Sequence, residues 1–403
     1  MEGNKMKVSK KILALALAGF MTVPFFAGCS SDGDSQDGGS NNGGNSAAGD
    51  SGDTSSAAGG TFKIGGIGPL TGDAASYGIS VKQGAQVAVD EINAAGGVNG
   101  MTLELLFEDD ECNEEKSVSA YNKLMDSDVN VILGAVTSGC SIAVSEASVN
   151  DGILQITPSG SAMDCTKQSN SFRICFTDPL QGKLMAQYIS EQGLKSPAII
   201  YDVASDYSKG IHDAFVEQAA ELDLTIVADE SFTSGDVDFK TQLTKIKSSG
   251  ADCLFLPIYY TEVGYISEQA ATVGVELPYF GCDGWDGVIN QLNGNTANIE
   301  GATFLTPFVA NSSNPKVTAF VDAYNKAYNA TPDQFAADAY DGVYVIKALL
   351  EQTGGDVSNE ALIGAMTQIT VDGATGSMSF TAEGEPNKSA MVAVIENGEY
   401  VGK

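Results

Sequence analysis

The chain has 403 residues and carries 52 acidic against 21 basic side chains, a formal net charge of -31. An excess of negative charge this large argues against nucleic acid and anionic lipid headgroups as partners. One histidine (His212) and one arginine (Arg173) leave little material for a hydrolase triad or an arginine-built anion site. The sequence has no G-x-S-x-G elbow, no P-loop and no cysteine–histidine zinc spacing, so it indicates no enzyme class, cofactor or metal.

A basic and then apolar stretch opens the chain. Four lysines precede an apolar run from Ile12 to Phe26, and two small residues separate that run from Cys29. This order predicts a secretory signal peptide over residues 1–28, because the run is short and Pro24 interrupts it. The small residues before Cys29 resemble a bacterial lipobox, which implies that Cys29 is lipidated and becomes the mature N-terminus. A plain secretory cleavage with an incidental cysteine is the alternative.

Residues 29–60 form the next segment. After Cys29 this segment consists almost entirely of Ser, Gly, Asp, Asn and Ala, which bury too little apolar surface to form a core. We expect a flexible, lipid-anchored tether with a root-mean-square span of roughly 30 Å. Roughly 340 residues follow the tether, which is enough for two α/β lobes with cores of their own.

From Thr61 onward, predicted strands and helices alternate, which favours an α/β fold with parallel sheets. The first series has strands at 62–67, 101–108, 129–133 and 153–157, followed by a crossing strand at 173–176. The second series has strands at 198–201, 225–228, 253–257, 278–280 and 303–305. Helices near 317–328, 335–352 and 360–369 and strands at 377–381 and 391–396 close the chain. Two consecutive series without a linker between them predict two doubly wound lobes.

Two hydroxyl-rich turns occur within the first series. Residues 134–139 follow one apolar strand, residues 158–161 follow the next, and a predicted helix joins the two strands. The carboxyl ends of neighbouring parallel strands share one edge of a sheet, where α/β proteins bind ligands. The turns therefore predict a carboxylate site made of hydroxyls and backbone N–H groups. The alternative is that Ser138 caps the helix and that residues 159–161 only form a tight turn.

Six cysteines follow Cys29, an even number that suggests disulfides in an exported chain, although six cysteines permit 15 pairings. We predict that Cys165 pairs with Cys175, because the two flank a short polar loop. Adjacent predicted strands also make a pair of Cys253 with Cys282 plausible. The remaining two, Cys112 and Cys140, each follow a strand of the first series.

Several stretches together point to one known family. They are Gly68-Pro69-Leu70-Thr71-Gly72, Val89–Gly100 (VDEINAAGGVNG), Asp109-Asp110-Glu111-Cys112, Ile156-Thr157-Pro158, Tyr259-Tyr260 and Asp283-Gly284. With them the chain resembles the extracytoplasmic binding proteins of branched-chain amino-acid ABC transporters, the leucine/isoleucine/valine-binding family. That family has the type I periplasmic binding fold, an α/β fold of two Rossmann-like lobes joined by a three-crossing hinge. The resemblance implies one lobe from residues 61–177 and 307–371, and another from residues 178–306 and 372–403.

The resemblance also implies residues for the two charged groups of an amino-acid ligand. Ser138 matches the family's carboxylate-binding serine. Within the next turn, Ser159 would offer its carbonyl and Ser161 its hydroxyl, with Gly160 between them. Asp283 matches the acidic partner of the ligand ammonium, a position that is usually glutamate in the family. An aspartate that merely caps a turn is the alternative for Asp283.

The residues implied for the ligand side chain are mostly aromatic. Tyr77 matches the tyrosine of the first loop, Tyr207 matches one that faces the ligand from the second lobe, and Tyr259 matches another. Phe335 matches a residue of the family's side-chain pocket. Trp285 is a departure from the family pattern and is interpreted either as a pocket residue or as a core residue. Ordinary surface aromatics are the alternative for Tyr207 and Tyr259.

These observations predict a binding protein rather than an enzyme. We expect a monomer, lipid-anchored on the extracytoplasmic face of the cell membrane, that captures an amino acid between its lobes and delivers it to an ABC importer. A branched-chain or other apolar amino acid is the expected ligand, with no cofactor and no metal. Two alternatives remain open on the same fold: a ligand sensor that signals to a membrane partner, and an enzyme acting on a small amide or amino acid.

Overall fold

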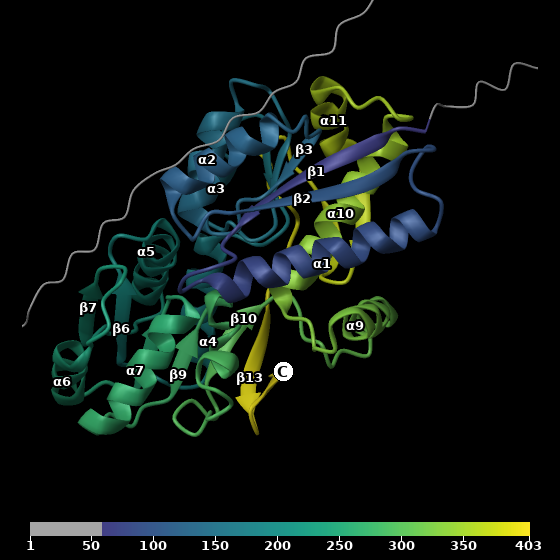
Figure 1. Cartoon of the computed structure of the whole chain (residues 1–403). Coiled ribbons are helices and arrows are strands. Elements are labelled where there is room, and N and C mark those ends of the chain that lie inside the picture. The colour runs from purple at the N-terminus through teal and green to yellow at the C-terminus, as the bar shows by residue number, and fades with distance from the viewer. Residues whose placement is uncertain (1–58) are drawn as a thin grey trace, which may run out of the picture. The chain divides into compact units, whose positions relative to one another are not determined.

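The computed structural model describes residues 59–403 of the chain (Figure 1). The predicted signal peptide, the lipidation site Cys29 and the tether up to residue 58 lie outside the described residues. Within residues 59–403, no helix combines the length and the apolar character needed to cross a membrane.

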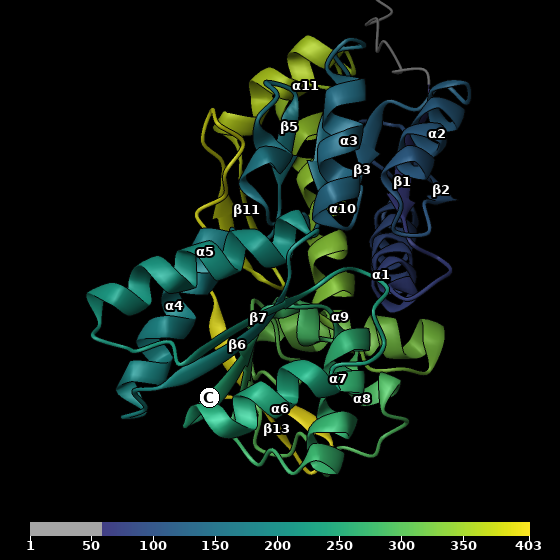
Figure 2. The same ribbon diagram turned by 90° about the vertical axis from the view of Figure 1, so that its left-hand side faces the viewer.

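The first sheet contains five parallel strands in the order β2-β1-β3-β4-β5. The strands are β1 (Thr61–Gly68), β2 (Thr102–Asp109), β3 (Val131–Leu133), β4 (Gln155–Thr157) and β5 (Ser171–Arg173). Its helices are α1 (Ala75–Ala94), α2 (Glu114–Met125), α3 (Ser138–Ser148), α10 (Gln334–Gln352) and α11 (Asn359–Ala365). The predicted strand–helix–strand unit is confirmed, because β3 and β4 are parallel neighbours joined by α3. Figure 2 shows α3 beside β3.

The second sheet contains seven strands in the order β14-β13-β10-β9-β8-β6-β7. The strands are β6 (Pro197–Asp202), β7 (Ala228–Phe232), β8 (Cys253–Leu256), β9 (Tyr279–Gly281), β10 (Thr303–Thr306), β13 (Met391–Glu396) and β14 (Glu399–Gly402). Its helices are α4 (Asp178–Glu191), α5 (Asp206–Glu221), α6 (Lys240–Ser249), α7 (Tyr260–Val273) and α8 (Val288–Gln291). The sheet is parallel from β7 to β10, whereas β13 runs antiparallel to both of its neighbours.

The chain passes between the two sheets three times. It leaves the first sheet after β5, returns after β10, and enters the second sheet again at β13. The second passage contains α9 (Pro315–Tyr328), and the third follows a hairpin of β11 (Thr370–Gly373) and β12 (Gly376–Ser379). The two-lobed α/β fold is thus confirmed, while the lobe boundaries given above stay a prediction.

Some elements differ from the predicted ones. The strand expected at 225–228 lies at 228–232, and β11 and β14 were not predicted. β7 is an edge strand with alternately exposed side chains, so the more apolar residues just before it misled the prediction. β14 is short and pairs only with β13, so its sequence pattern is weak.

Close packing of α1 on α10 brings two aromatic residues together. A Cβ atom at Gly84 would lie 2.0 Å from the carbonyl oxygen of Ala336, so only glycine permits this approach of the two helices. The approach places the ring of Tyr77, near the start of α1, against the ring of Phe335, near the start of α10.

Candidate functional site

The two hydroxyl-rich turns meet at the carboxyl edge of the first sheet. Ser138 is the first residue of α3, and its Oγ accepts hydrogen bonds from the backbone N–H groups of Ser161 and Ala162, both at 3.2 Å. Thr137 takes the N-cap position of α3, so Ser138 is not the cap that the alternative interpretation supposed. These bonds use both N–H groups within the protein and tie the second turn to the start of α3, whose positive N-terminal end suits a carboxylate.

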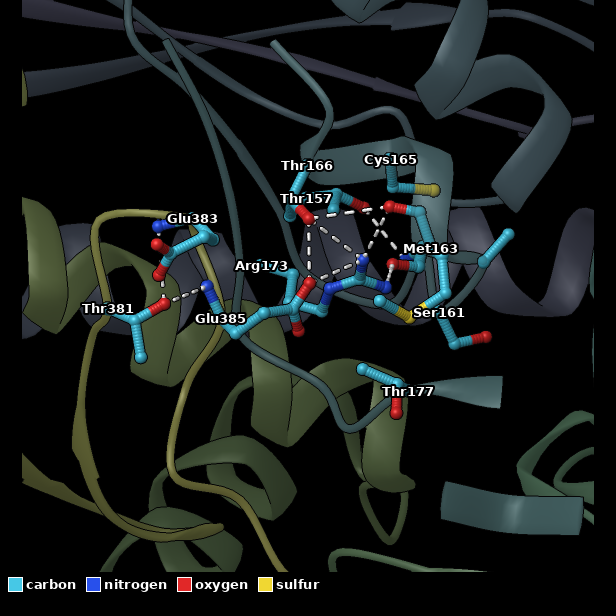
Figure 3. A network of polar contacts seen from close by, with 12 residues as sticks. Thr157, Ser161, Met163, Cys165, Thr166, Arg173, Thr177, Thr381, Glu383 and Glu385 are labelled. Carbon is cyan, nitrogen blue, oxygen red and sulfur yellow. Dashed lines mark hydrogen bonds and ion pairs between the residues drawn. The ribbon is translucent and has the colours of Figure 1, made fainter. Parts of the chain in front are cut away.

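Arg173 supports the second of these turns from behind (Figure 3). Its side chain is fully buried, and Nη1 donates to the Gly160 carbonyl at 2.9 Å. Nη2 donates to Thr166 Oγ1 at 3.1 Å and to Glu385 Oε1 at 2.9 Å. With its guanidinium committed to these partners, Arg173 positions the turn and is not a ligand group itself.

The second lobe contributes a tyrosine and an acid. The Tyr207 hydroxyl donates to Asp283 Oδ1 at 2.6 Å and accepts a hydrogen bond from the Gly284 amide at 2.9 Å. Gln181 Oε1 accepts from the Asp283 amide at 3.0 Å. The ring of Tyr207 stacks on that of Tyr259, with centroids 4.8 Å apart. Tyr207 and Tyr259 therefore lie beside Asp283 around one cavity and are not surface aromatics.

The first lobe closes the other side with aromatic rings. The centroids of Tyr77 and Phe335 lie 4.1 Å apart, and Tyr77 meets Tyr259 edge-on at 5.3 Å. These rings and Asp283 surround a cavity of about 10 Å³, which we call the aromatic cavity. Its lining is Tyr77, Val136, Thr137, Ser159, Tyr207, Tyr259, Asp283, Gly284 and Phe335. A volume this small holds about one water molecule, so any larger ligand would fit only if the walls moved apart.

Asp283 is the charged group of the aromatic cavity. Burial raises the pKa of Asp283 to about 6, although the hydrogen bond from the Tyr207 hydroxyl acts in the opposite direction. The lining contains no lysine, arginine or histidine to neutralise the carboxylate. A ligand ammonium would supply the missing counterion.

Asp178 and Gln181 are polar residues near the site that the sequence did not reveal. Asp178 is fully buried, its amide donates to the Ser161 carbonyl at 3.0 Å, and burial raises its pKa. Within the described part of the chain, both carboxylate oxygens of Asp178 lack a hydrogen-bond partner, and so does Gln181 Nε2. Asp178 begins α4 next to Pro179, a pattern that reads as an ordinary helix start. Nothing in the sequence signals its burial.

Other predicted residues lie outside the lining of the aromatic cavity. Ser138, Gly160 and Ser161 do not line it, and their contact with a ligand stays a prediction. Trp285 is fully buried, and its indole Nε1 donates to the Leu256 carbonyl of β8 at 2.8 Å. This contact places Trp285 in the core of the second lobe, which was one of its two interpretations. Val136 and Thr137, which belong to the predicted 134–139 turn, and Gly284 also line the cavity, although none of them was named as a ligand residue.

An acidic cleft of about 270 Å³ adjoins the aromatic cavity and shares Thr137, Tyr207 and Tyr259 with it. Six carboxylates line this cleft, and no lysine, arginine or histidine does: Asp73, Glu111, Glu114, Asp202, Asp206 and Glu262. Burial, with the nearby charges of Asp202 and Asp73, raises the pKa of Glu262 to about 7. The approach to the aromatic cavity on this side is therefore strongly negative.

The cysteine prediction needs correction. All six cysteines between residues 59 and 403 are free thiols, so Cys165 and Cys175 are not bonded to each other. The Cys165 thiol instead lies 3.6 Å from the Ser138 carbonyl, and both thiols are buried. A disulfide requires the two cysteine side chains to point toward each other, and closeness along a short loop does not ensure this.

Comparisons with known proteins bear on this geometry. A profile of the periplasmic binding protein family matches residues 61–399. A Leu/Ile/Val-binding protein homolog from Brucella melitensis is 33% identical over 353 residues, which cover 86% of this chain and 95% of that protein. The leucine-, isoleucine-, valine-, threonine- and alanine-binding protein of Pseudomonas aeruginosa is 30% identical over 335 residues, covering 82% of this chain and 88% of that protein.

Solved structures agree with the sequence comparisons. LivJ of Streptococcus pneumoniae, a branched-chain amino acid transporter substrate-binding protein solved in complex with isoleucine, matches with a TM-score of 0.77 at 34% identity. The match covers 85% of this chain and all of LivJ. A leucine-binding protein, LivK, of Thermotoga maritima matches with a TM-score of 0.79 at 28% identity, covering 85% and 97%. With a two-lobed fold, a site between the lobes and these relatives, the chain belongs to the periplasmic binding protein family.

Proposed function

We propose that the protein is an extracytoplasmic solute-binding protein that captures an amino acid between its lobes and delivers it to an ABC importer. The observation that carries the proposal is the pairing of opposite charge preferences across one cavity. Thr137 and Ser159 line the first-lobe side of the cavity beside the N-terminus of α3, and Asp283 of the second lobe offers an unneutralised carboxylate. An α-amino acid brings a carboxylate and an ammonium in the matching order.

The aromatic walls indicate the ligand's side chain. Tyr77, Tyr259 and Phe335 present ring faces and edges, and no charged residue other than Asp283 lines the cavity. A charged side chain would lose its hydration there without gaining a partner, so leucine, isoleucine, valine or a close relative is the proposed ligand. The solved relatives from Streptococcus pneumoniae and Desulfitobacterium hafniense contain isoleucine and leucine, respectively.

The proposed mode of action depends on closure. The carboxylate groups and Asp283 come from different lobes, so only a closed form contacts both ends of the ligand. Ligand therefore shifts the open–closed equilibrium by its preference for the closed form. The closed, loaded monomer would then dock on the permease, held near the membrane by lipidated Cys29 and the tether over residues 29–60. The lobe limits proposed above, 61–177 with 307–371 and 178–306 with 372–403, define the two moving bodies.

Calorimetric titration with single amino acids tests the proposal. Leucine, isoleucine or valine should bind with a stoichiometry of one, and lysine, glutamate and sugars should not compete. Small-angle scattering should show a smaller radius of gyration with ligand if the ligand-free protein populates open forms. Tight binding of a dicarboxylate that lacks an amine would contradict the role assigned to Asp283.

A further inference from the structure

A second cavity, of about 480 Å³, lies between α8, α9 and the β13–β14 turn, and we call it the α8–α9 cavity. It shares no lining residue with the aromatic cavity. Its apolar wall comes from three parts of the chain: Ile289 of α8, Phe308–Ala310 after β10, and Val321 of α9. A cleft of this size with apolar walls has the dimensions of a small-molecule site.

The charge in the α8–α9 cavity is all of one sign. Asp286, Asp333 and Glu399 line it, and no lysine, arginine or histidine does. Both oxygens of Asp333 are occupied, because Oδ2 accepts from the Ser80 hydroxyl at 2.6 Å and Oδ1 from the Ala336 amide at 2.9 Å. Asp333 is thus the N-cap of α10 and is satisfied within the protein.

Asp286 is not satisfied in the same way. Its side chain is only 4% exposed, and Oδ2 accepts a hydrogen bond from the Gln334 amide at 3.1 Å. Backbone amides are its donors, and no lysine, arginine or histidine lines the cavity to act as its counterion. Burial and then the charge of Asp333 raise the pKa of Asp286. A carboxylate that is buried, faces a cavity and has no counterion calls for a cation from outside the chain.

We propose that the α8–α9 cavity binds a small organic cation, an amine carried on an apolar body, with Asp286 as its counterion. The ammonium would pair with the Asp286 carboxylate, and the apolar body would cover Phe308 and Val321. A metal ion would leave the apolar wall uncovered. Moreover, the described residues contain no group of three His, Cys, Asp or Glu side chains placed to hold a metal. An anion would meet three carboxylates and no positive group.

Gln334 connects this cavity to the aromatic cavity. Its backbone N–H donates to Asp286, and its side-chain Nε2 donates to the backbone carbonyl of Asp283 at 2.5 Å. Its Oε1 accepts from the Thr306 hydroxyl at 3.0 Å, which fixes the amide's orientation. Gln334 therefore contacts the carboxylate of Asp286 and the backbone of Asp283. An amine bound at Asp286 and a ligand bound at Asp283 should change each other's affinity by the same factor.

The probe for the test is 2-phenylethylamine, titrated by calorimetry into the purified protein at pH 8. Three variants accompany the wild type. Asp286→Asn removes the counterion, Val321→Trp fills the cavity from α9, and Ala319→Trp adds the same indole to an exposed position of α9 that does not line the cavity. We expect saturable binding in the wild type and in Ala319→Trp, and affinity at least about tenfold weaker in the other two variants. The neutral analogue 2-phenylethanol should also bind at least about tenfold more weakly than the amine.

Three results would overturn the proposal. One is the absence of binding up to about 10 mM amine, the range of a weak fragment. Another is unchanged amine affinity in Val321→Trp, and the third is equal affinity for the amine and the alcohol. A crystal of wild-type protein soaked in the amine gives a readout that does not depend on any variant folding. The ammonium should appear beside the Asp286 carboxylate, and density only elsewhere would also refute the site.

Discussion

The phenol of Tyr77 donates a hydrogen bond to the backbone carbonyl of Gly284 at 2.5 Å. Tyr77 belongs to α1 in the first lobe and Gly284 follows β9 in the second, so this bond joins the lobes across the aromatic cavity. The Tyr260 amide, also in the second lobe, donates to the same phenol oxygen at 3.3 Å. Part of the free energy of closure therefore comes from the protein's own groups, before any ligand binds.

Replacing Tyr77 by phenylalanine removes this bond and leaves the ring in place. The net contribution of such a bond is about 1 kcal/mol, so the ratio of closed to open forms should fall about fivefold. Small-angle scattering of the ligand-free variant should give a larger radius of gyration than the wild type. Tyr121→Phe is the control, because the Tyr121 hydroxyl bonds to Asp151 within the first lobe. Equal radii for Tyr77→Phe and Tyr121→Phe would show that the Tyr77 bond does not govern closure.

Asp283→Asn should lower ligand affinity by orders of magnitude. Removing one member of a buried ion pair costs roughly 3–5 kcal/mol, and asparagine keeps the size of the side chain while losing its charge. Titration calorimetry with leucine measures the loss. Asp206→Asn makes the same charge change at an exposed residue of the acidic cleft and should retain wild-type affinity. Near-wild-type affinity of Asp283→Asn would place the ammonium elsewhere.

The same carboxylate should make the ligand-free protein less stable as the pH rises. Its pKa is about 6 in the fold against 3.8 when unperturbed, so the fold favours the protonated form. Below about pH 4 the carboxyl is neutral in both states, and its stability contribution is lost as the pH rises through about 6. Two pKa units correspond to about 3 kcal/mol. Asp283→Asn should therefore raise the melting temperature relative to wild type at pH 8 but not at pH 4. An equal difference at both values would refute the raised pKa.

Arg173→Lys should weaken both the fold and ligand binding. A lysine ammonium cannot donate at once to the Gly160 carbonyl and the Glu385 carboxylate, which the planar guanidinium does. We expect a loss of about 2 kcal/mol in urea unfolding, together with weaker binding of leucine because the 159–161 turn loses its support. Glu385→Gln leaves the guanidinium buried without its counterion and should show a similar loss of stability. Wild-type stability of both variants would mean that this contact contributes nothing.

Cys29→Ala tests the predicted anchor. The signal, the lipobox-like residues and the tether all point to lipidation at Cys29. The variant should move from the membrane fraction to the released fraction on cell fractionation, while leucine binding by its folded body stays unchanged. Retention of the variant on the membrane would contradict the lipoprotein assignment.

Strands with a clear apolar run were predictable from sequence, and weakly patterned ones were not. β3 and β4 are buried on both faces, so continuous apolar residues marked them and the turns that follow them. β7 and β14 lie at the two edges of the second sheet and carry exposed side chains, so their composition resembles that of a loop. A run of apolar residues in the sequence marks a strand that is buried. Edge strands bury few of their side chains, so they lack such a run.

The candidate site divides along a similar line. Tyr77, Tyr207, Tyr259 and Phe335 were found through the family resemblance, and the structure gathers them around one cavity. The core position of Trp285 depends on which way its side chain turns at the end of β9, which spacing does not encode. The unpartnered carboxylate of Asp178 depends on burial by a different segment, because α5 passes beside it at Gly210. The local sequence pattern therefore did not reveal contacts between residues that are distant in sequence.

The six carboxylates of the acidic cleft have a consequence for the speed of capture. A neutral zwitterion carries both of its charges close together and feels little net force as it approaches. Glutamate and aspartate carry net negative charge and are repelled before they reach any contact residue. The cleft would thus sort amino acids by arrival rate as well as by affinity. Because the Debye length shrinks to about 8 Å at physiological ionic strength, added salt should narrow the difference between the two arrival rates.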